Sequence, residues 1–208
     1  MTELEKKVLL TKDEYDYLME HFSHNDSAPL NPIVKQINYY YDTDDLSMNQ
    51  QDITCRIRLK GGKYKGTMKK HSFDSDFSTE IDMDIQNGLE DNAFTTMGLK
   101  LQGELVTERC IILEDEVCEV VLDKNEYLGY TDYELEIEYN EAFEHYAERI
   151  LNIMIDSLVH NSKSDSAQHT YNQIQQVPSK SKRFFQRMSN TKTTVQKCAS
   201  KFSNRNTN

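Results

Sequence analysis

Charged and apolar side chains alternate one by one in a series of short segments between residues 1 and 140, and this alternation constrains the fold more than any other feature. Near residue 135, for example, Glu134, Glu136 and Glu138 alternate with Leu135 and Ile137. Successive side chains of a strand point to opposite faces of a sheet, so a period of two predicts strands. Each of these strands has one apolar face and one charged face.

Eight segments are predicted strands, several of them with this charged and apolar alternation, and turn signals such as the Gly61-Gly62 pair lie between them. The predicted strands cover residues 3–10, 34–42, 53–60, 64–70, 78–85, 104–113, 117–123 and 131–139. Eight antiparallel strands are enough to close a barrel. The sequence therefore predicts an α+β protein with an eight-stranded antiparallel β-barrel, or tunnel, and helices packed outside it. A sandwich of two sheets is the alternative that the pattern alone leaves open.

Helical spacing appears in three places. Thr11 and Glu14 form a predicted capping box at the start of a first helix. A brief helical stretch is predicted near residues 88–98, and an amphipathic helix begins near residue 142 and leads into a C-terminal helical segment. We expect residues 1–188 to form one domain and residues 189–208, rich in Ser, Thr, Asn and Lys, to form a basic, flexible tail.

The net charge is unevenly distributed. Residues 1–140 hold 14 Lys and Arg against 30 Asp and Glu, whereas the whole chain carries −11. An acidic body argues against nucleic acid bound on the outer surface.

No apolar run reaches the roughly 20 residues of a membrane helix and no hydrophobic signal region opens the chain, and the four cysteines lack metal-ligand spacing. These features predict a cytoplasmic protein that does not enter a membrane. The oligomeric state stays open, with a homodimer among the options.

The sign of the charge differs from strand to strand. Acidic side chains dominate the first and last strands, whereas Arg56, Arg58 and Lys69 lie on strands in the middle. For any single strand, a solvent-exposed face explains such charges equally well, but a solvated surface more typically mixes both signs. Carboxylates bind Mg²⁺ or Mn²⁺ and guanidinium groups bind phosphate oxygens. The segregation thus favours a metal and polyphosphate site inside the barrel.

Short charged motifs support this interpretation. They are Glu3-x-Glu5-x-Lys7, Arg56-x-Arg58, Thr67-x-Lys69, Thr107-x-Arg109, Leu122-Asp123, Glu134-x-Glu136-x-Glu138 and Lys180-x-x-Arg183-Phe184. In order and spacing over about residues 2–187, they resemble the motifs of the CYTH domain, also called the triphosphate tunnel metalloenzymes. The resemblance implies an eight-stranded antiparallel tunnel, in agreement with the strand count.

The resemblance also implies roles for individual residues. The implied metal ligands are Glu3, Glu5, Asp123, Glu134 and Glu136. The implied triphosphate-binding residues are Lys7, Arg56, Arg58, Lys69, Arg109, Lys180 and Arg183. Glu5, Lys69 and Glu136 would act at the catalytic centre. Glu138 ranks lower because it lies nearer the strand end, and Lys60 is either a peripheral contact or an ordinary hairpin lysine.

The function implied is that of a metal-dependent hydrolase that uses Mg²⁺ or Mn²⁺. Its small-molecule substrate would be inorganic tripolyphosphate or a related organic triphosphate. Three alternatives stay open: an adenylate cyclase that converts ATP to cyclic AMP, a sensor that binds a triphosphate or nucleotide without catalysis, and processing of an RNA 5′-triphosphate. The acidic body counts against the last of these.

Overall fold

The computed structural model describes residues 3–23, 32–71, 78–85, 88–161 and 177–203. The chain forms two compact units, Met1–Val177 and Pro178–Asn208. The first unit contains all eight predicted strands, in one sheet. They are β1 (Glu3–Leu10), β2 (Val34–Asp42), β3 (Ile53–Lys60), β4 (Lys63–His71), β5 (Ser78–Asp84), β6 (Lys100–Glu114), β7 (Cys118–Tyr127) and β8 (Tyr130–Asn140).

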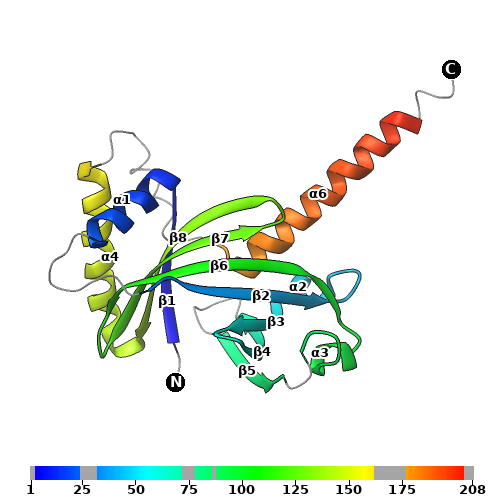
Figure 1. Cartoon of the computed structure of the whole chain (residues 1–208), viewed down its shortest axis with the longest axis horizontal. Coiled ribbons are helices and arrows are strands. Elements are labelled where there is room, and N and C mark those ends of the chain that lie inside the picture. The colour runs from blue at the N-terminus through cyan, green and yellow to red at the C-terminus, as the bar shows by residue number, and fades with distance from the viewer. Residues whose placement is uncertain (1–2, 24–31, 72–77, 86–87, 162–176, 204–208) are drawn as a thin grey trace. The chain divides into compact units, whose positions relative to one another are not determined.

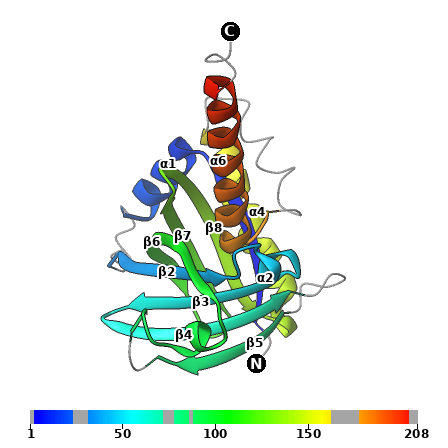
Figure 2. The same ribbon diagram turned by 90° about the vertical axis from the view of Figure 1, so that its right-hand side faces the viewer.

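The sheet has the order β1-β8-β7-β6-β2-β3-β4-β5, and every neighbouring pair is antiparallel. This confirms the predicted eight-stranded antiparallel sheet. The sheet curves strongly, as Figures 1 and 2 show, so that β7 and β8 run steeply across the direction of β3, β4 and β5. Among the described residues no hydrogen-bonded ladder joins the two edge strands, β1 and β5, so hydrogen bonds do not close the predicted barrel.

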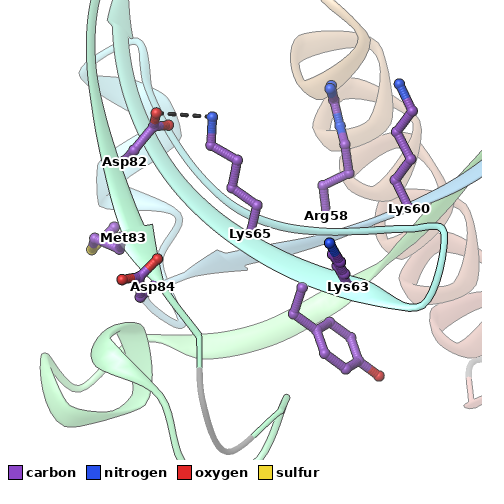
Figure 3. Close-up of a pocket in the computed structure, with 8 residues that line it drawn as sticks. Arg58, Lys60, Lys63, Lys65, Asp82, Met83 and Asp84 are labelled. Atoms are coloured by element: carbon purple, nitrogen blue, oxygen red, sulfur yellow. Dashed lines mark ion pairs between the residues drawn. The ribbon is translucent and has the colours of Figure 1, made fainter.

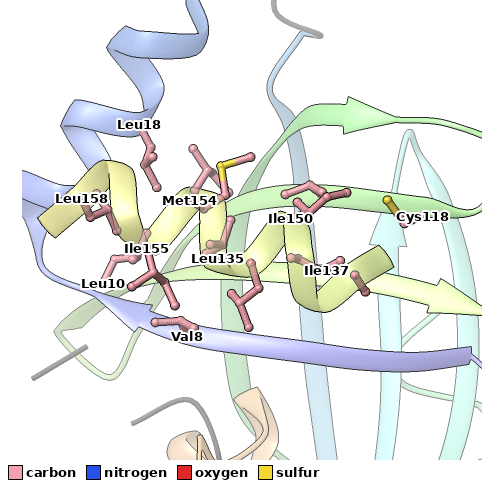
Figure 4. Close-up of a cluster of buried hydrophobic side chains, with 14 of the residues drawn as sticks. Val8, Leu10, Leu18, Cys118, Leu135, Ile137, Ile150, Met154, Ile155 and Leu158 are labelled. Atoms are coloured by element: carbon pink, nitrogen blue, oxygen red, sulfur yellow. The ribbon is translucent and has the colours of Figure 1, made fainter. Parts of the chain in front are cut away.

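Two helices cover the outer face of β1, β7 and β8. They are α1 (Lys12–Ser23) and α4 (Glu144–Asn161), and their apolar sides pack on the apolar sides of the strands (Figure 4). In this cluster Val8, Leu18, Leu135 and Ile137 have no exposed surface. The predicted capping box is present, because the Thr11 backbone N–H donates to Glu14 Oε2 at 2.7 Å and the Glu14 N–H donates to Thr11 Oγ1 at 3.2 Å.

A second hydrophobic cluster lies on the outer face of β2 and β3 and includes Tyr41, Ile57 and Phe94. Phe94 belongs to α3 (Ala93–Thr96), and a further short helix, α2 (Ser47–Gln50), follows β2. The helical stretch predicted for residues 88–98 is therefore shorter than expected. The Asn92 side chain accepts hydrogen bonds from the Phe94 and Thr95 backbone N–H groups and fixes the start of α3, and Gly98, at φ +80°, follows its end.

Asp42 is the last residue of β2, and its side chain stabilises the turn that leads into α2. Its buried carboxylate accepts hydrogen bonds from the backbone N–H groups of Thr43, Met48 and Asn49 at 2.7, 2.9 and 2.9 Å. We expect Asp42→Ala to lower the free energy of unfolding by about 3 kcal/mol, because three backbone N–H groups would lose a charged acceptor. Urea denaturation measures this loss. Asp44→Ala is the matched control, since Asp44 makes an exposed ion pair with Lys100. Equal losses in the two variants would contradict the prediction.

The second unit contains α6 (Lys180–Ser203), which is preceded in the chain by Pro178. The helix spans residue 188, and the division between the two compact units falls between Val177 and Pro178. The predicted domain bounds, 1–188 and 189–208, stay a prediction. Residues 204–208 of the predicted tail lie outside the described residues. No helix in the described part of the chain is long and apolar enough to cross a membrane.

Candidate active site

Strands β1, β7 and β8 place carboxylates side by side on the inner face of the sheet. Asp123 of β7 pairs with Glu134 of β8, and Glu138 of β8 lies between Glu5 of β1 and Glu119 of β7. Asp123 and Glu134 are completely buried. Like charges directly opposite each other destabilise a sheet, and burying a carboxylate is costly unless it is paired. The inner face here must therefore bind cations.

Arg109, on β6, is the main cation within this acidic cluster. It donates from Nε and Nη2 to the two oxygens of Asp123 at 2.9 and 2.8 Å. Nη2 also lies 2.5 Å from Glu136 Oε2, and Nη1 lies 3.0 Å from Glu138 Oε1. Burial would lower the pKa of Arg109, but the hydrogen bonds to Asp123 and the charges of the three carboxylates raise it. One guanidinium thus joins the acids of β7 and β8.

Lys7 neutralises the carboxylates on the β1 side. Its Nζ lies 2.5 Å from Glu5 Oε1 and 3.6 Å from Glu136 Oε1. Burial raises the pKa of Glu5; the Lys7 ammonium opposes this rise, and the Glu136 carboxylate adds to it. Glu136, only 3% exposed, is therefore the carboxylate that Arg109 and Lys7 share.

The basic side chains of β3 and β4 have far fewer acidic partners. Arg58 donates from Nε to the neutral Asn38 Oδ1 at 3.0 Å. Burial and the neighbouring guanidinium groups of Arg56 and Arg109 lower the pKa of Arg58 to about 10. Arg56 lies 4.0 Å from Glu80, and its buried Nε has no acceptor among the described residues. These guanidinium groups are thus available to bind an anion.

The acidic and basic strands face each other because the sheet curves. In the order of the sheet β1 and β4 are far apart, yet the charge of Lys69 on β4 acts on Glu5 of β1. The charge of Arg58 on β3 likewise interacts with that of Glu136 on β8. The curvature visible in Figure 2 thus brings the cations of β3 and β4 opposite the carboxylates of β1 and β8.

Most of the predicted site residues lie on this shared face. Glu5, Lys7, Arg109, Asp123 and Glu136 form one network of ion pairs and hydrogen bonds. Glu134 adjoins Asp123, while Arg56, Arg58 and Lys69 lie on the facing strands. The side chain of Glu3 lies outside the described residues, although its backbone pairs with Asn140. Lys180 and Arg183 lie in α6, in the second unit, and their role stays a prediction.

The sequence interpretation missed Glu119 on β7. Its Oε1 lies 3.9 Å from Arg109 Nη1, and burial together with the charge of Glu138 raises the pKa of Glu119. Glu119 and Asp123 share a face by the period of two, but the apolar Val121 lies between them and obscures the alternation. Asn38, the partner of Arg58, was missed as well, because a neutral amide gives no charge signal.

The donor atoms of the acidic cluster fit a divalent metal ion. Glu5, Asp123, Glu134 and Glu136 offer hard carboxylate oxygens, which are the ligands that Mg²⁺ and Mn²⁺ prefer. Within the described part of the chain, however, no group of three or more such side chains is already arranged around a common metal position. Arg109 and Lys7 bind the carboxylate oxygens instead, so a metal ion would compete with these two cations.

The fold and the site define a class of protein: a curved antiparallel β protein whose inner face carries a cluster of carboxylates opposite a cluster of basic side chains. The chain belongs to the CYTH domain family, whose family model matches residues 1–171. A relative from Bacillus subtilis, described as "Putative triphosphatase YjbK", is 30% identical over 150 residues, which cover 65% of this chain and 76% of that protein. The family match ends before α6.

Solved structures share the fold. A Bacillus halodurans protein described as a "putative adenylate cyclase" matches with a TM-score of 0.62 and 24% identity, over 88% of this chain and 97% of its own. The Hippeastrum protein HpAC1 matches with a TM-score of 0.56 and 17% identity, over 86% of this chain and 98% of its own. At these identities the likeness concerns the fold alone.

Proposed function

We propose that this protein is a metal-dependent hydrolase of triphosphates, with inorganic tripolyphosphate as the first candidate substrate. The observation that carries the proposal is the opposition of two clusters across one face of the sheet. Carboxylates of β1, β7 and β8 face Arg56, Arg58 and Lys69 of β3 and β4. Hydrolysis of a phosphoanhydride needs both a cation cradle and a metal site.

The cations of β3 and β4 bind and orient the phosphate oxygens in this proposal. Guanidinium groups suit this role because their planar N–H donors form paired hydrogen bonds with phosphate. Arg56 and Arg58 hold one side of the chain of phosphates, and Lys69 contributes a point charge near Glu5. Their positive charge stabilises the negative charge that develops on the leaving pyrophosphate.

The carboxylates Glu5, Asp123, Glu134 and Glu136 hold Mg²⁺ or Mn²⁺ in this proposal. The metal, when bound, supplies charge neutralisation and orients the attacking water. Arg109 and Lys7 pair with carboxylates of this cluster. If a metal ion neutralised these carboxylates, the two basic side chains would be available for phosphate oxygens.

Two of the similar proteins carry names that point to hydrolysis, whereas the Bacillus halodurans protein is described as a putative adenylate cyclase. The Bacillus subtilis relative is described as a putative triphosphatase. HpAC1, although described as a putative adenylyl cyclase, is reported to have a dominant triphosphatase activity. Charged side chains make up most of the lining of the cavity beside Arg58, which offers little to recognise a nucleobase.

We expect phosphate release from tripolyphosphate to require Mg²⁺ or Mn²⁺ and to fall about 10²-fold or more when EDTA replaces the metal, because the metal contributes several kcal/mol to stabilising the transition state. ATP and thiamine triphosphate serve as comparison substrates in the same assay. Release that is indifferent to EDTA would contradict the metal assignment. Cyclic AMP made from ATP, without release of inorganic phosphate from any substrate, would favour the cyclase instead.

A further inference from the structure

A cavity of about 580 Å³ opens at the hairpin of β3 and β4, next to the proposed triphosphate site (Figure 3). Charged residues make up most of its lining: Arg58, Lys60, Lys63, Lys65, Asp82 and Asp84. Four cations thus face two carboxylates, so the cavity carries an excess of positive charge in a chain whose net charge is −11. This local reversal of sign indicates a binding site for an anion.

Two pairs of like charges face each other across this hairpin. Lys60 pairs with Lys63, and Arg58 pairs with Lys65. Figure 3 shows Arg58, Lys60 and Lys65 rising from the same side of the hairpin. Like charges directly opposite each other destabilise a sheet, so this arrangement works against the stability of the free protein and favours the binding of an anion.

The turn does not relieve this repulsion, and the neighbouring strand β5 relieves it only at Lys65. Gly61 and Gly62 have φ values of +56° and +76°, the left-handed conformation of a tight two-residue turn, which keeps Lys60 and Lys63 opposite each other. Lys65 makes an ion pair of 2.8 Å with Asp82. Across the described ranges of the chain, neither Lys60 nor Lys63 forms an ion pair with a carboxylate.

The lining favours phosphate over a nucleoside at this position. Tyr64 is the one aromatic side chain among the described residues that line the cavity, and it alternates with Lys63 and Lys65, so it belongs to the opposite face of β4. A nucleoside triphosphate would place a neutral sugar and a base beyond its phosphates, whereas a longer polyphosphate would place further negative charges there. Because Arg58 belongs both to this cavity and to the proposed triphosphate site, one linear chain of phosphates can extend from one to the other.

We infer that the β3–β4 hairpin forms an accessory subsite that binds phosphate groups beyond the third, and that the substrate class therefore includes linear polyphosphates longer than tripolyphosphate. The inference rests on the proposed function for the position of the first three phosphates. Lys60 and Lys63 provide the new contacts, and Arg58 joins the two parts of the site.

The test is the double variant Lys60→Gln/Lys63→Gln, compared with the wild-type protein for tripolyphosphate and for a longer linear polyphosphate. Equilibrium binding by calorimetry in EDTA, where the metal-dependent reaction is stopped, gives a readout independent of turnover. We expect the affinity for the longer polyphosphate to fall about 10-fold, equivalent to about 1.4 kcal/mol, and the affinity for tripolyphosphate to change less than about 2-fold. With Mg²⁺ present, we expect KM of the double variant to rise for the longer polyphosphate and to change little for tripolyphosphate, with kcat unchanged for both.

The matched control is Lys70→Gln/Lys100→Gln, which removes the same charge from exposed positions outside the cavity. We expect this control variant to bind tripolyphosphate and the longer polyphosphate as tightly as the wild type does. Equal losses for both ligands in the Lys60/Lys63 variant would overturn the inference, because the lysines would then belong to the triphosphate site or act only through net charge. No loss for either ligand would overturn it as well. If the wild-type protein hydrolyses no triphosphate, the proposed function fails, while the binding comparison still decides whether the hairpin binds the longer chain.

Discussion

Replacing Glu136 by Gln is expected to lower kcat for metal-dependent tripolyphosphate hydrolysis about 10²–10³-fold, comparable to the loss of a single preorganised charge-stabilising group in other enzymes. Glu136 is only 3% exposed, and its carboxylate is shared by Arg109 and Lys7. Gln keeps the shape and one acceptor oxygen but removes the negative charge that would bind the metal. The measurement is phosphate release at saturating Mg²⁺ and again at saturating Mn²⁺, with thermal unfolding as the check on folding.

The matched control is Glu126→Gln on β7. Glu126 is half exposed and pairs at 2.8 Å with Lys124, away from the acidic cluster, so its loss leaves kcat unchanged. Glu5→Gln tests the β1 side of the cluster and is expected to follow Glu136→Gln. A Glu136→Gln protein that retains full activity with either metal would show that Glu136 holds no catalytic metal.

The strands were predictable because apolar and charged side chains alternate along them even where neither face of the strand is exposed to solvent. Leu135 and Ile137 pack under α4, while Glu134 and Glu136 of the same strand lie on the inner face. A period of two therefore marks both faces of the strand even though both are buried. The capping box of Thr11 and Glu14 was predictable for a similar reason, since its partners are three residues apart in the sequence.

The partners of the charged residues were not predictable, because they depend on which strands become neighbours. The structure places β6 between β7 and β2, which brings Arg109 beside Asp123. The resemblance assigns Arg109 to the triphosphate, and the local sequence gives no sign that it also joins carboxylates of β7 and β8. In the same way, the sequence predicts that Lys60 is a peripheral contact or a hairpin lysine beside the Gly61-Gly62 turn, but the pairing of Lys60 with Lys63 is given by the register of β3 and β4. The alternation along a strand predicts on which face of the sheet a side chain lies, whereas the register between strands decides which side chains contact each other.

Arg109→Ala is expected to lower the free energy of unfolding of the metal-free protein by about 3–5 kcal/mol, the usual cost of removing one partner from a buried ion pair. Arg109 donates two hydrogen bonds to the fully buried Asp123 and one each to Glu136 and Glu138. Without the guanidinium, the buried carboxylates of Asp123 and Glu136 would lose a counter-ion, while Lys7 would still lie 3.6 Å from Glu136. Urea denaturation in EDTA measures the loss, and Arg149→Ala, which removes an exposed arginine of α4, is the matched control.

Metal ions distinguish this electrostatic cost from a simple loss of packing. If Arg109 holds the carboxylates that a divalent cation would otherwise bind, Mn²⁺ or Mg²⁺ must stabilise the Arg109→Ala protein more than the wild type, because in the variant the metal no longer competes with a guanidinium. Arg109→Lys keeps the charge but loses the forked hydrogen bonds to Asp123. We expect metal ions to stabilise this variant more than the wild type and less than Arg109→Ala. Equal stabilisation of all three proteins by metal would show that the cation binds elsewhere. A variant as stable as the wild type in EDTA would show that the buried carboxylates do not depend on Arg109. The result expected here, a large loss in EDTA that Mn²⁺ partly restores, would place the metal on the carboxylates that Arg109 occupies in the free protein.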